Sequence, residues 1–383
     1  PMKAFSVRWT GTITPPGAGD YTFGVNNHRC FRCEGHEIFK VYLDGKLVID
    51  SDSSNRQSGP SSFTAYFADA APHALRVDYS HLSPLFGAGA VFNWKPPVEV
   101  LRDKAVEAAK KADVVVAIVG LSPHLEGEEM PIHIEGFNGG DRTDIILPAV
   151  QRDLLQALAA TGKPLVVVLM NGSALAVNWA EQHAAAILEA WYPGEDGGTA
   201  IAETLSGANN PAGRLPITFY SALSQLPPFE DYSMQNRTYR YFHGKPLYTF
   251  GYGLSYSSFA FSNIHLSAKS LHAGQPLTVT ADVRNTSKVA GDEVAELYLS
   301  YPPSQTAPIR ALKGFERIHL APGEAGKISF TLSLRELSQV SEKGERRILP
   351  GAYSVYTGGS QPGTGSEGVE ASFTITGEQA LPR

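Results

Sequence analysis

The sequence is short of several features that would point to particular classes of protein. Only two of its 383 residues are cysteines, which excludes a disulfide-rich scaffold. The net charge is −6, without a basic excess, and this argues against a nucleic-acid-binding protein. No apolar run approaches the ~20 residues that a membrane-spanning helix requires. We therefore expect no nucleic-acid partner and no membrane. A hydrophobic content of 43% and a charged content of 18% instead predict ordinary globular domains.

The two cysteines stand close together, at Cys30 and Cys33. A redox pair with this spacing would lie where a strand turns into a helix, but these cysteines lie among short predicted strands. Two thiols alone cannot complete a zinc site, and no set of histidines and carboxylates has metal-binding spacing. We expect a local disulfide or two plain thiols, with a redox or metal role as the alternative. No cofactor and no metal are predicted.

Residues 1 to about 95 alternate between apolar and polar side chains, as β-strands do. The strongest hairpin signal lies at 39–50, where two alternating runs flank Asp44-Gly45, a pair that suits a tight primed turn. The region predicts a β-sandwich, with Trp9 and Trp94 expected to pack in its core rather than to stack on sugars. No signal peptide precedes the first strand pattern, and we expect a truncated beginning rather than a natural start.

From Asp113 onward the pattern changes to alternating strands and helices, which predicts a mostly parallel sheet with right-handed crossovers. The run 113–119 is nearly all β-branched and does not alternate, so we expect a strand buried on both faces. Glu195 and Asp196 are expected at the start of a helix, where carboxylates suit the helix dipole. The further strands are expected at 164–170 and 186–191, and the helices at 99–112, 148–161, 177–185 and 197–205.

The stretch from Gly120 to Arg142 is the strongest candidate for a functional loop. It follows the first parallel strand, and four glycines after Gly120, at 127, 136, 139 and 140, favour a loop over a helix. Ligands and chemistry collect beyond the carboxyl ends of the strands in an open α/β sheet. This acidic stretch is therefore a candidate catalytic loop, with a solvated charged loop as the alternative. Arg142 is its one full positive charge, and its carboxylates are those of Glu126, Glu128, Glu129, Glu135 and Asp141.

Several long motifs resemble, in order, the C-terminal part of glycoside hydrolase family 3. They are GEE followed by EGFNGGDR (127–142), LPAVQRDLLQAL (147–158), KPLVVVLMNGSALAVNWA (163–180), AAAILEAWYPGEDGGTAIAETLSGANNPAGRLPITF (184–219) and YTFGYGLSYSSF (248–259). GDEVAELYL (291–299) and LKGFERIHLAPGE (312–324) resemble the fibronectin type III-like domain that closes many of these enzymes. The first 95 residues resemble the protective-antigen-type β-sandwich that some members carry as an insertion.

The resemblance implies a multidomain fold of α/β plus all-β parts. We expect a protective-antigen-type β-sandwich at 1–95, an incomplete α/β sandwich with a mostly parallel sheet at 96–220, and a connecting segment at 221–258. A fibronectin type III-like β-sandwich is expected at 259–383. The family's nucleophile lies on a (β/α)₈ barrel, which needs ~250 residues and has no room in this chain. We expect that barrel to be a missing partner from the same enzyme.

The family's acid/base glutamate occupies a Gly-Glu setting, which Gly127-Glu128 matches. Glu128 is therefore the predicted acid/base and Glu129 the runner-up, since relatives commonly have glycine where Glu129 stands. Neighbouring carboxylates at Glu126 and Glu129 are expected to raise the pKa of Glu128. Asp141 and Arg142 are predicted to form an ion pair that shapes the loop.

The resemblance implies the C-terminal portion of a retaining exo-β-glycosidase, of the β-glucosidase or β-xylosidase type, acting on an oligosaccharide or a β-glycoside. This chain alone is expected to be inactive. The alternative is a non-catalytic carbohydrate-binding assembly. A third possibility is the β-N-acetylglucosaminidase branch, which takes its acid/base elsewhere, and Gly127-Glu128 argues against it. The family also implies a secreted or periplasmic protein.

Overall fold

A computed structural model describes residues 4–27, 37–52, 62–81, 90–123, 125–126, 129–130, 132–303, 307–341, 343–363 and 368–382. The chain divides into two compact units, one of residues 1–115 with 153–165 and one of residues 116–152 with 166–383. Cys30, Cys33 and Glu128 lie outside the described residues, and what was predicted for them remains a prediction.

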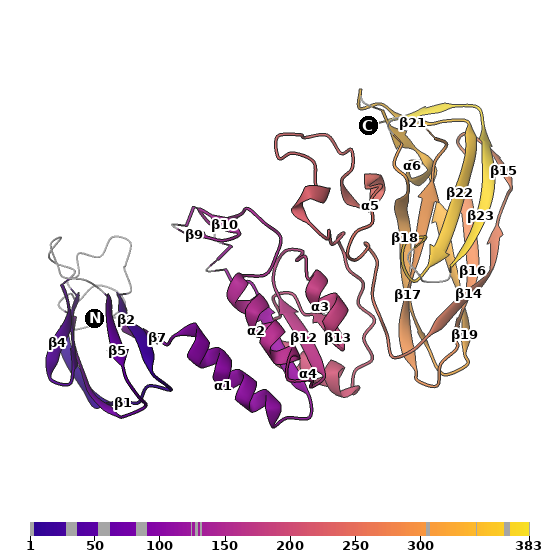
Figure 1. Cartoon of the computed structure of the whole chain (residues 1–383). Helices are drawn as coiled ribbons and strands as arrows, with labels where there is room; N and C mark the ends of the chain where they lie inside the picture. Colours follow the sequence, from indigo (N-terminus) through magenta and orange to yellow (C-terminus); the bar gives the residue numbers. More distant parts are fainter. Residues whose placement is uncertain are drawn as a thin grey trace. The chain divides into compact units, whose positions relative to one another are not determined.

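Two antiparallel sheets make up the N-terminal part of the first unit (Figure 1). One has the strand order β1-β6-β3-β4 and the other the order β5-β2-β7. Side chains of both sheets form one buried cluster, which includes Phe39 and Val77 from one sheet and Tyr21 and Phe67 from the other. The strands are β1 (Phe5–Ile13), β2 (Gly19–Asn27), β3 (Glu37–Leu43), β4 (Lys46–Asp52), β5 (Ser62–Phe67), β6 (His73–His81) and β7 (Ala90–Lys95), and helix α1 (Val98–Lys110) follows.

The expected hairpin is present, because Leu43 pairs with Lys46 and leaves Asp44 and Gly45 as the two-residue turn. Both turn residues have positive φ, 47° and 79°, as a primed turn requires. The two tryptophans differ. Trp94 packs against the core and stacks on Tyr21, as expected, whereas the prediction for Trp9 is wrong, because its side chain is 49% exposed.

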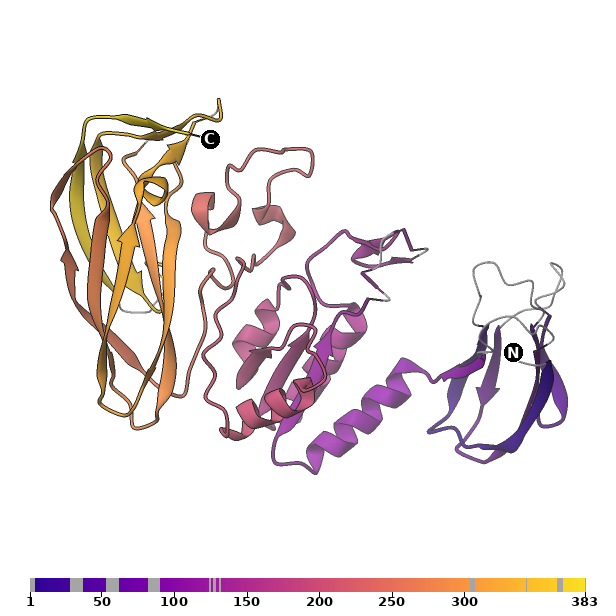
Figure 2. The ribbon, with the colours of Figure 1, turned by 180° about the vertical axis from the view of Figure 1, so that it is seen from behind.

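Three strands in the order β13-β12-β8 form the sheet of the α/β part (Figure 2). β12 and β13 are parallel, and Val167 and Val168 of β12 are fully buried. This sheet explains the run of β-branched residues, which pack well on a pleated surface. The elements are β8 (Val115–Gly120), α2 (Ala149–Ala159), β12 (Leu165–Met170), α3 (Asn178–His183), β13 (Ala186–Glu189) and α4 (Gly197–Ser206).

Strand β8 differs from the expectation of burial on both faces. Ala117 and Val119 are buried, but Val116 and Ile118 are 48% and 61% exposed. Successive side chains of a strand point to opposite faces, and β8 is the edge strand of this sheet. Among the described residues, β8 is therefore buried on one face only.

The acidic stretch after β8 is more ordered than a plain loop. It contains a small antiparallel sheet of three two-residue strands, β9 (His133–Ile134), β10 (Phe137–Asn138) and β11 (Asp141–Arg142). Gly136, Gly139 and Gly140 all have positive φ, so the predicted glycine-rich turns connect strands rather than interrupt a helix. The side chain of Phe137 in β10 is buried.

Asp196 lies at the N-cap position of α4, as predicted, although its side chain makes no capping hydrogen bond. The segment that follows α4 is mostly irregular. It holds a short 3₁₀ helix, η1 (Leu223–Gln225), and one helical turn, α5 (Thr238–Tyr241). Among the described residues, no helix combines the length and the apolarity needed to cross a membrane.

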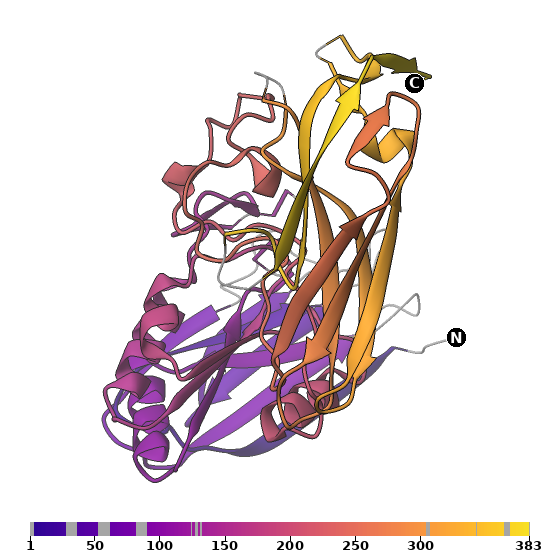
Figure 3. The same cartoon turned by 90° about the vertical axis from the view of Figure 1, so that its right-hand side faces the viewer.

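The C-terminal part is a β-sandwich, whose strands can be followed in Figure 3. The sheets β15-β23-β22-β17-β18 and β14-β16-β19 share a buried core that includes Val279 of β16 and Leu297 of β17. The strands of these sheets are β14 (Phe259–Leu266), β15 (Ser270–His272), β16 (Leu277–Asn285), β17 (Gly291–Ser300), β18 (Ala311–Leu320), β19 (Ala325–Leu332), β22 (Gly351–Gly358) and β23 (Val369–Thr376). Helix α6 (Leu334–Leu337) and a small sheet of β20 (Gln339–Val340), β21 (Arg346–Ile348) and β24 (Gln379–Leu381) complete it.

Buried acidic side chains on β17 join this sandwich to the segment before it. Glu293 forms a buried ion pair with Arg214 at 2.7 Å, and Arg214 also donates to the carbonyl of Gly359. Glu296 is 4% exposed and accepts a hydrogen bond from the hydroxyl of Tyr298. Burial raises the pKa of Glu296 to about 7, against the lowering effects of Tyr298 and Arg214.

We expect this carboxyl to make the stability of the protein depend on pH. A folded-state pKa above the unfolded value means that the stabilisation is present below about pH 4.5 and is lost as the pH rises to about 7. Glu296→Gln keeps an acceptor for Tyr298 and removes the buried charge. Urea unfolding should show the variant to be more stable than the parent above pH 7, by about 3 kcal/mol at most. Glu316→Gln, at an exposed position on β18, is the control, and an equal gain there would contradict the assignment.

Candidate active site

Three segments from the sheet of the second unit meet around one carboxylate. They are the loop after β8, the turn after β12 and the turn after β13. Leu121 donates its backbone N–H to the carbonyl of Met170 at 2.9 Å, so the first two segments leave the sheet side by side. A Cβ at Gly120 would lie 1.9 Å from that carbonyl oxygen, and only glycine allows this approach. The polar groups beyond the strands therefore converge, as expected for an open α/β sheet.

Glu126 is the carboxylate at the centre of this group. Its Oε1 accepts a hydrogen bond of 2.6 Å from the hydroxyl of Ser173, in the turn after β12. Its Oε2 accepts one of 2.8 Å from the hydroxyl of Tyr192, which follows β13. The side chain of Glu126 is 16% exposed, and the bond to Ser173 is partly buried, whereas the bond to Tyr192 is open to solvent. The three segments are thus tied together through one side chain.

Arg142 supplies the positive charge of the group. Its Nη1 lies 3.9 Å from Oε1 of Glu126 and donates to the hydroxyl of Ser173 at 2.5 Å and to the carbonyl of Ala174 at 3.1 Å. The predicted ion pair between Asp141 and Arg142 is wrong, because the acidic partner of Arg142 is Glu126. The two residues are consecutive in β11, and consecutive side chains of a strand point to opposite faces. Burial lowers the pKa of Arg142, and the Glu126 carboxylate opposes that effect.

The turn after β13 is held in an unusual conformation. Trp191 has a φ of 54°, and its N–H donates to Oε1 of Glu189 at 3.1 Å. Burial raises the pKa of Glu189 to about 7, and hydrogen bonds from Trp191 and Asn171 oppose the rise. A Cβ at Gly172 would lie 2.7 Å from the ring of Tyr192, so the glycine leaves room for that ring. The ring of Tyr192 therefore packs closely over Gly172, in the turn after β12.

The predicted site residues fall into three groups. Glu128, the predicted acid/base, and Gly127 before it lie outside the described residues. Glu129 is exposed and has a φ of 51°, and Asp141 is exposed as well. Arg142 lies within the group of residues around Glu126. Sequence reasoning missed Ser173 and Tyr192 as partners of Glu126, and their only signal was their place directly after strands β12 and β13.

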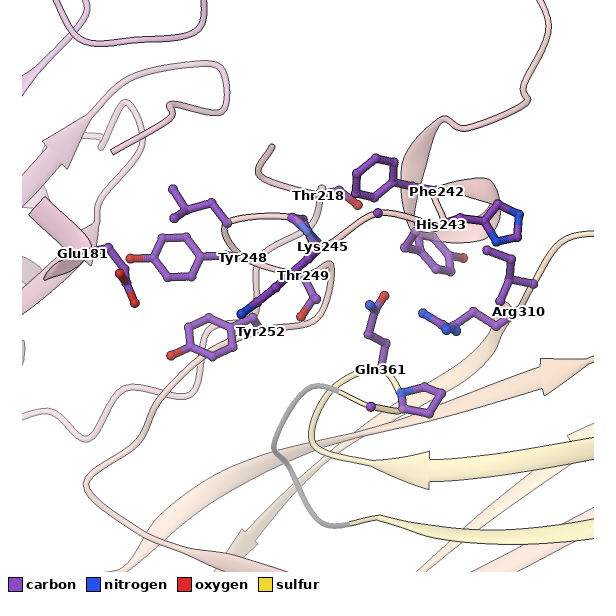
Figure 4. Close-up of a pocket in the computed structure, with 17 residues that line it drawn as sticks. Glu181, Thr218, Phe242, His243, Lys245, Tyr248, Thr249, Tyr252, Arg310 and Gln361 are labelled. Carbon is purple, nitrogen blue, oxygen red and sulfur yellow. The ribbon is translucent and has the colours of Figure 1, made fainter. Parts of the chain in front are cut away.

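A separate cavity of ≈ 670 Å³ lies between the connecting segment and the C-terminal sandwich (Figure 4). Its lining includes Tyr248 and Tyr252, whose rings stack with centroids 5.3 Å apart and whose hydroxyls point toward Glu181. Arg310 and Gln361 contribute from the sandwich. None of the described residues of the acidic loop lines this cavity. In the part of the chain that the structure describes, no group of three or more histidine, cysteine, aspartate or glutamate side chains could hold a metal ion.

Two known family models match this chain. The glycosyl hydrolase family 3 C-terminal domain matches residues 35–256, more than half of the chain, and a fibronectin type III-like domain matches residues 293–361. The chain belongs to glycoside hydrolase family 3.

Curated relatives support the same assignment. A xylan 1,4-beta-xylosidase of Xylanibacter ruminicola is 35% identical over 361 residues, which are 94% of this chain and 40% of the relative. A periplasmic beta-glucosidase of Salmonella typhimurium is 41% identical over 273 residues, covering 68% of this chain and 34% of the relative. The chain thus spans between about a third and a half of the length of the relatives it matches.

Solved structures show the same fold. A beta-glucosidase from Kluyveromyces marxianus, in complex with glucose, is 27% identical with a TM-score of 0.72, covering 98% of this chain and 45% of that chain. A beta-glucosidase from Listeria innocua, also in complex with glucose, is 29% identical with a TM-score of 0.62 and covers 74% of this chain and 39% of that chain.

Proposed function

We propose that this chain is the C-terminal portion of a retaining exo-acting β-glycosidase, of the β-glucosidase or β-xylosidase type. Glu128 is its acid/base, and the nucleophile comes from a (β/α)₈ barrel outside the chain. The supporting observation is the carboxylate-bearing loop that leaves β8 and is tied to the ends of β12 and β13 through Glu126. Relatives named beta-xylosidase and beta-glucosidase, of which the chain covers less than half, support the activity.

The chemistry requires two carboxyl groups about 5–5.5 Å apart. In the first step the barrel carboxylate attacks the anomeric carbon, while Glu128 gives its proton to the departing oxygen. In the second step Glu128 takes a proton from water, whose oxygen attacks the same carbon and frees the nucleophile. The substrate is an oligosaccharide or a β-glycoside, and one sugar leaves from its non-reducing end.

The proposed domains are a protective-antigen-type β-sandwich at 1–95, an incomplete α/β sandwich at 96–220, a connecting segment at 221–258 and a fibronectin type III-like domain at 259–383. Two exposed apolar side chains on β8, Val116 and Ile118, support an α/β sheet that continues with further elements. A secreted or periplasmic site is part of the proposal and is supported by the relative named as periplasmic.

The proposal predicts that the purified chain has no glycosidase activity on aryl β-glucosides or β-xylosides. An acid/base without a nucleophile provides only half of the mechanism. The longer enzyme, in which this chain follows a (β/α)₈ barrel, should hydrolyse at least one of the two substrates. Turnover by the pure chain, or an inactive longer enzyme that folds, would contradict the proposal.

A further inference from the structure

Glu126 makes a set of contacts that no other described carboxylate of the acidic loop makes. Both of its oxygens accept hydroxyl hydrogen bonds, and its charge lies against a partly buried arginine. Glu129 is exposed, and Glu135 is 61% exposed with one ion pair, to Arg152. Hydrogen bonds to an ionised acceptor are shorter and stronger than neutral ones, and the 2.6 Å separation from Ser173 fits this class.

The donors that hold Glu126 are themselves held in place. Arg142 donates to Ser173, which in turn donates to Glu126, so the three side chains form a chain of hydrogen bonds. Nε of Arg142 is fixed by the carbonyl of Asp144 at 3.1 Å. Burial and the Glu126 carboxylate raise the pKa of Tyr192 to about 12, so its hydroxyl remains a donor at neutral pH. The carboxylate therefore sits in a preformed site rather than on a free loop.

The backbone around this point is anchored on both sides of residues 127 and 128. Before them, the N–H groups of Leu125 and Glu126 both donate to the carbonyl of Ser122, at 2.8 and 3.1 Å. After them, Met130 donates to the carbonyl of Gly139 at 3.0 Å, at the small sheet. Glu126 therefore lies on a stretch of backbone that is hydrogen-bonded within the loop, and the loop is hydrogen-bonded again at Met130.

We propose that Glu126 is a positioning residue, whose carboxylate fastens the acid/base loop to the ends of β12 and β13 through Ser173 and Tyr192. This inference rests on the proposed function, since Glu128 is the group that is positioned. The inference also changes the electrostatic role expected for Glu126, which was to raise the pKa of Glu128 by repulsion. Its charge is compensated by Arg142, so its contribution is to geometry more than to repulsion of a neighbouring carboxylate.

The test compares leaving groups in the longer enzyme that contains this chain. A misplaced general acid slows departure of a poor leaving group, such as a sugar, more than departure of a dinitrophenolate, which needs little protonation. Glu126→Ala should lower kcat/KM about 100-fold on a disaccharide, as expected for a small misplacement, and far less on a dinitrophenyl glycoside. A loss of folded enzyme would lower both by the same factor. Glu126→Gln, which keeps the size but loses the charge, should fall between the parent and Glu126→Ala.

Two further variants keep the test decisive if Glu126→Ala does not fold. Tyr192→Phe and Ser173→Ala each remove one donor to the carboxylate, and each should show the same leaving-group dependence to a smaller degree. In the double variant, the losses of kcat/KM from Glu126→Ala and Tyr192→Phe should not add, because both changes remove the same hydrogen bond between these two side chains. Glu135→Gln, in the same loop, is the matched control and should leave both rates unchanged.

The outcomes separate this inference from the proposed function. If Glu128→Ala shows leaving-group dependence but Glu126→Ala, Tyr192→Phe and Ser173→Ala slow both substrates equally, Glu126 is not a positioning residue. If Glu128→Ala itself shows no such dependence, the proposed acid/base is wrong, whatever the Glu126 variants do. Azide should restore turnover to Glu128→Ala but not to Glu126→Ala, which would confirm that Glu126 acts through another group.

Discussion

Glu128→Ala in the longer enzyme is expected to slow hydrolysis of natural disaccharides by about 10²–10⁴-fold, the usual contribution of a general acid. Activated aryl glycosides should lose much less in the first step, because their phenolate departs with little help. The second step loses its general base, so the covalent intermediate accumulates. As a result kcat and KM should fall together on an activated substrate.

Azide provides the decisive measurement for this variant. It attacks the anomeric carbon without a general base, so it should restore turnover and yield a β-glycosyl azide. Glu129→Ala is the runner-up and should show no rescue. Rescue of Glu129→Ala but not of Glu128→Ala would move the acid/base by one residue. If azide rescues neither variant, the acid/base is a residue other than Glu128 and Glu129.

Arg214→Met is expected to cause the largest loss of stability of any single change considered for this chain. Arg214 and Glu293 are 9% and 6% exposed, and the change leaves the Glu293 carboxylate buried without its cation. Breaking a buried ion pair on one side typically costs about 3–5 kcal/mol. Urea denaturation of the 383-residue chain would measure this loss.

A neighbouring ion pair provides the control. Asp292, next to Glu293 on β17, pairs with Arg317, which is 65% exposed. Arg317→Met should cost no more than about 1 kcal/mol, as exposed ion pairs usually do. Replacing both Arg214 and Glu293 by methionine should cost less than Arg214→Met alone, because no buried charge is left. If Arg214→Met and Arg317→Met lower the free energy of unfolding equally, burial of the Arg214–Glu293 pair does not increase the cost of breaking it.

Local patterns in the sequence were enough to predict many of the elements. Asp44-Gly45 predicted a hairpin turn because few residue pairs tolerate two positive φ values, and the structure has both. The apolar run at 164–170 predicted β12, and the carboxylate at Asp196 marked the start of α4. Each of these features depends on residues close in sequence, so composition and spacing contain the necessary information.

The sequence by itself determined the order of the main strands and helices of the α/β part, the likeness to a known family and the acidic stretch at the end of β8. Tertiary structure alone decided which charges meet. Arg142 pairs with Glu126 rather than with its neighbour Asp141, and Arg214 pairs with Glu293, 79 residues away. Such pairs depend on which strand ends lie side by side and on which face each side chain takes. These are properties of the packed sheet, and no local pattern in the chain records them.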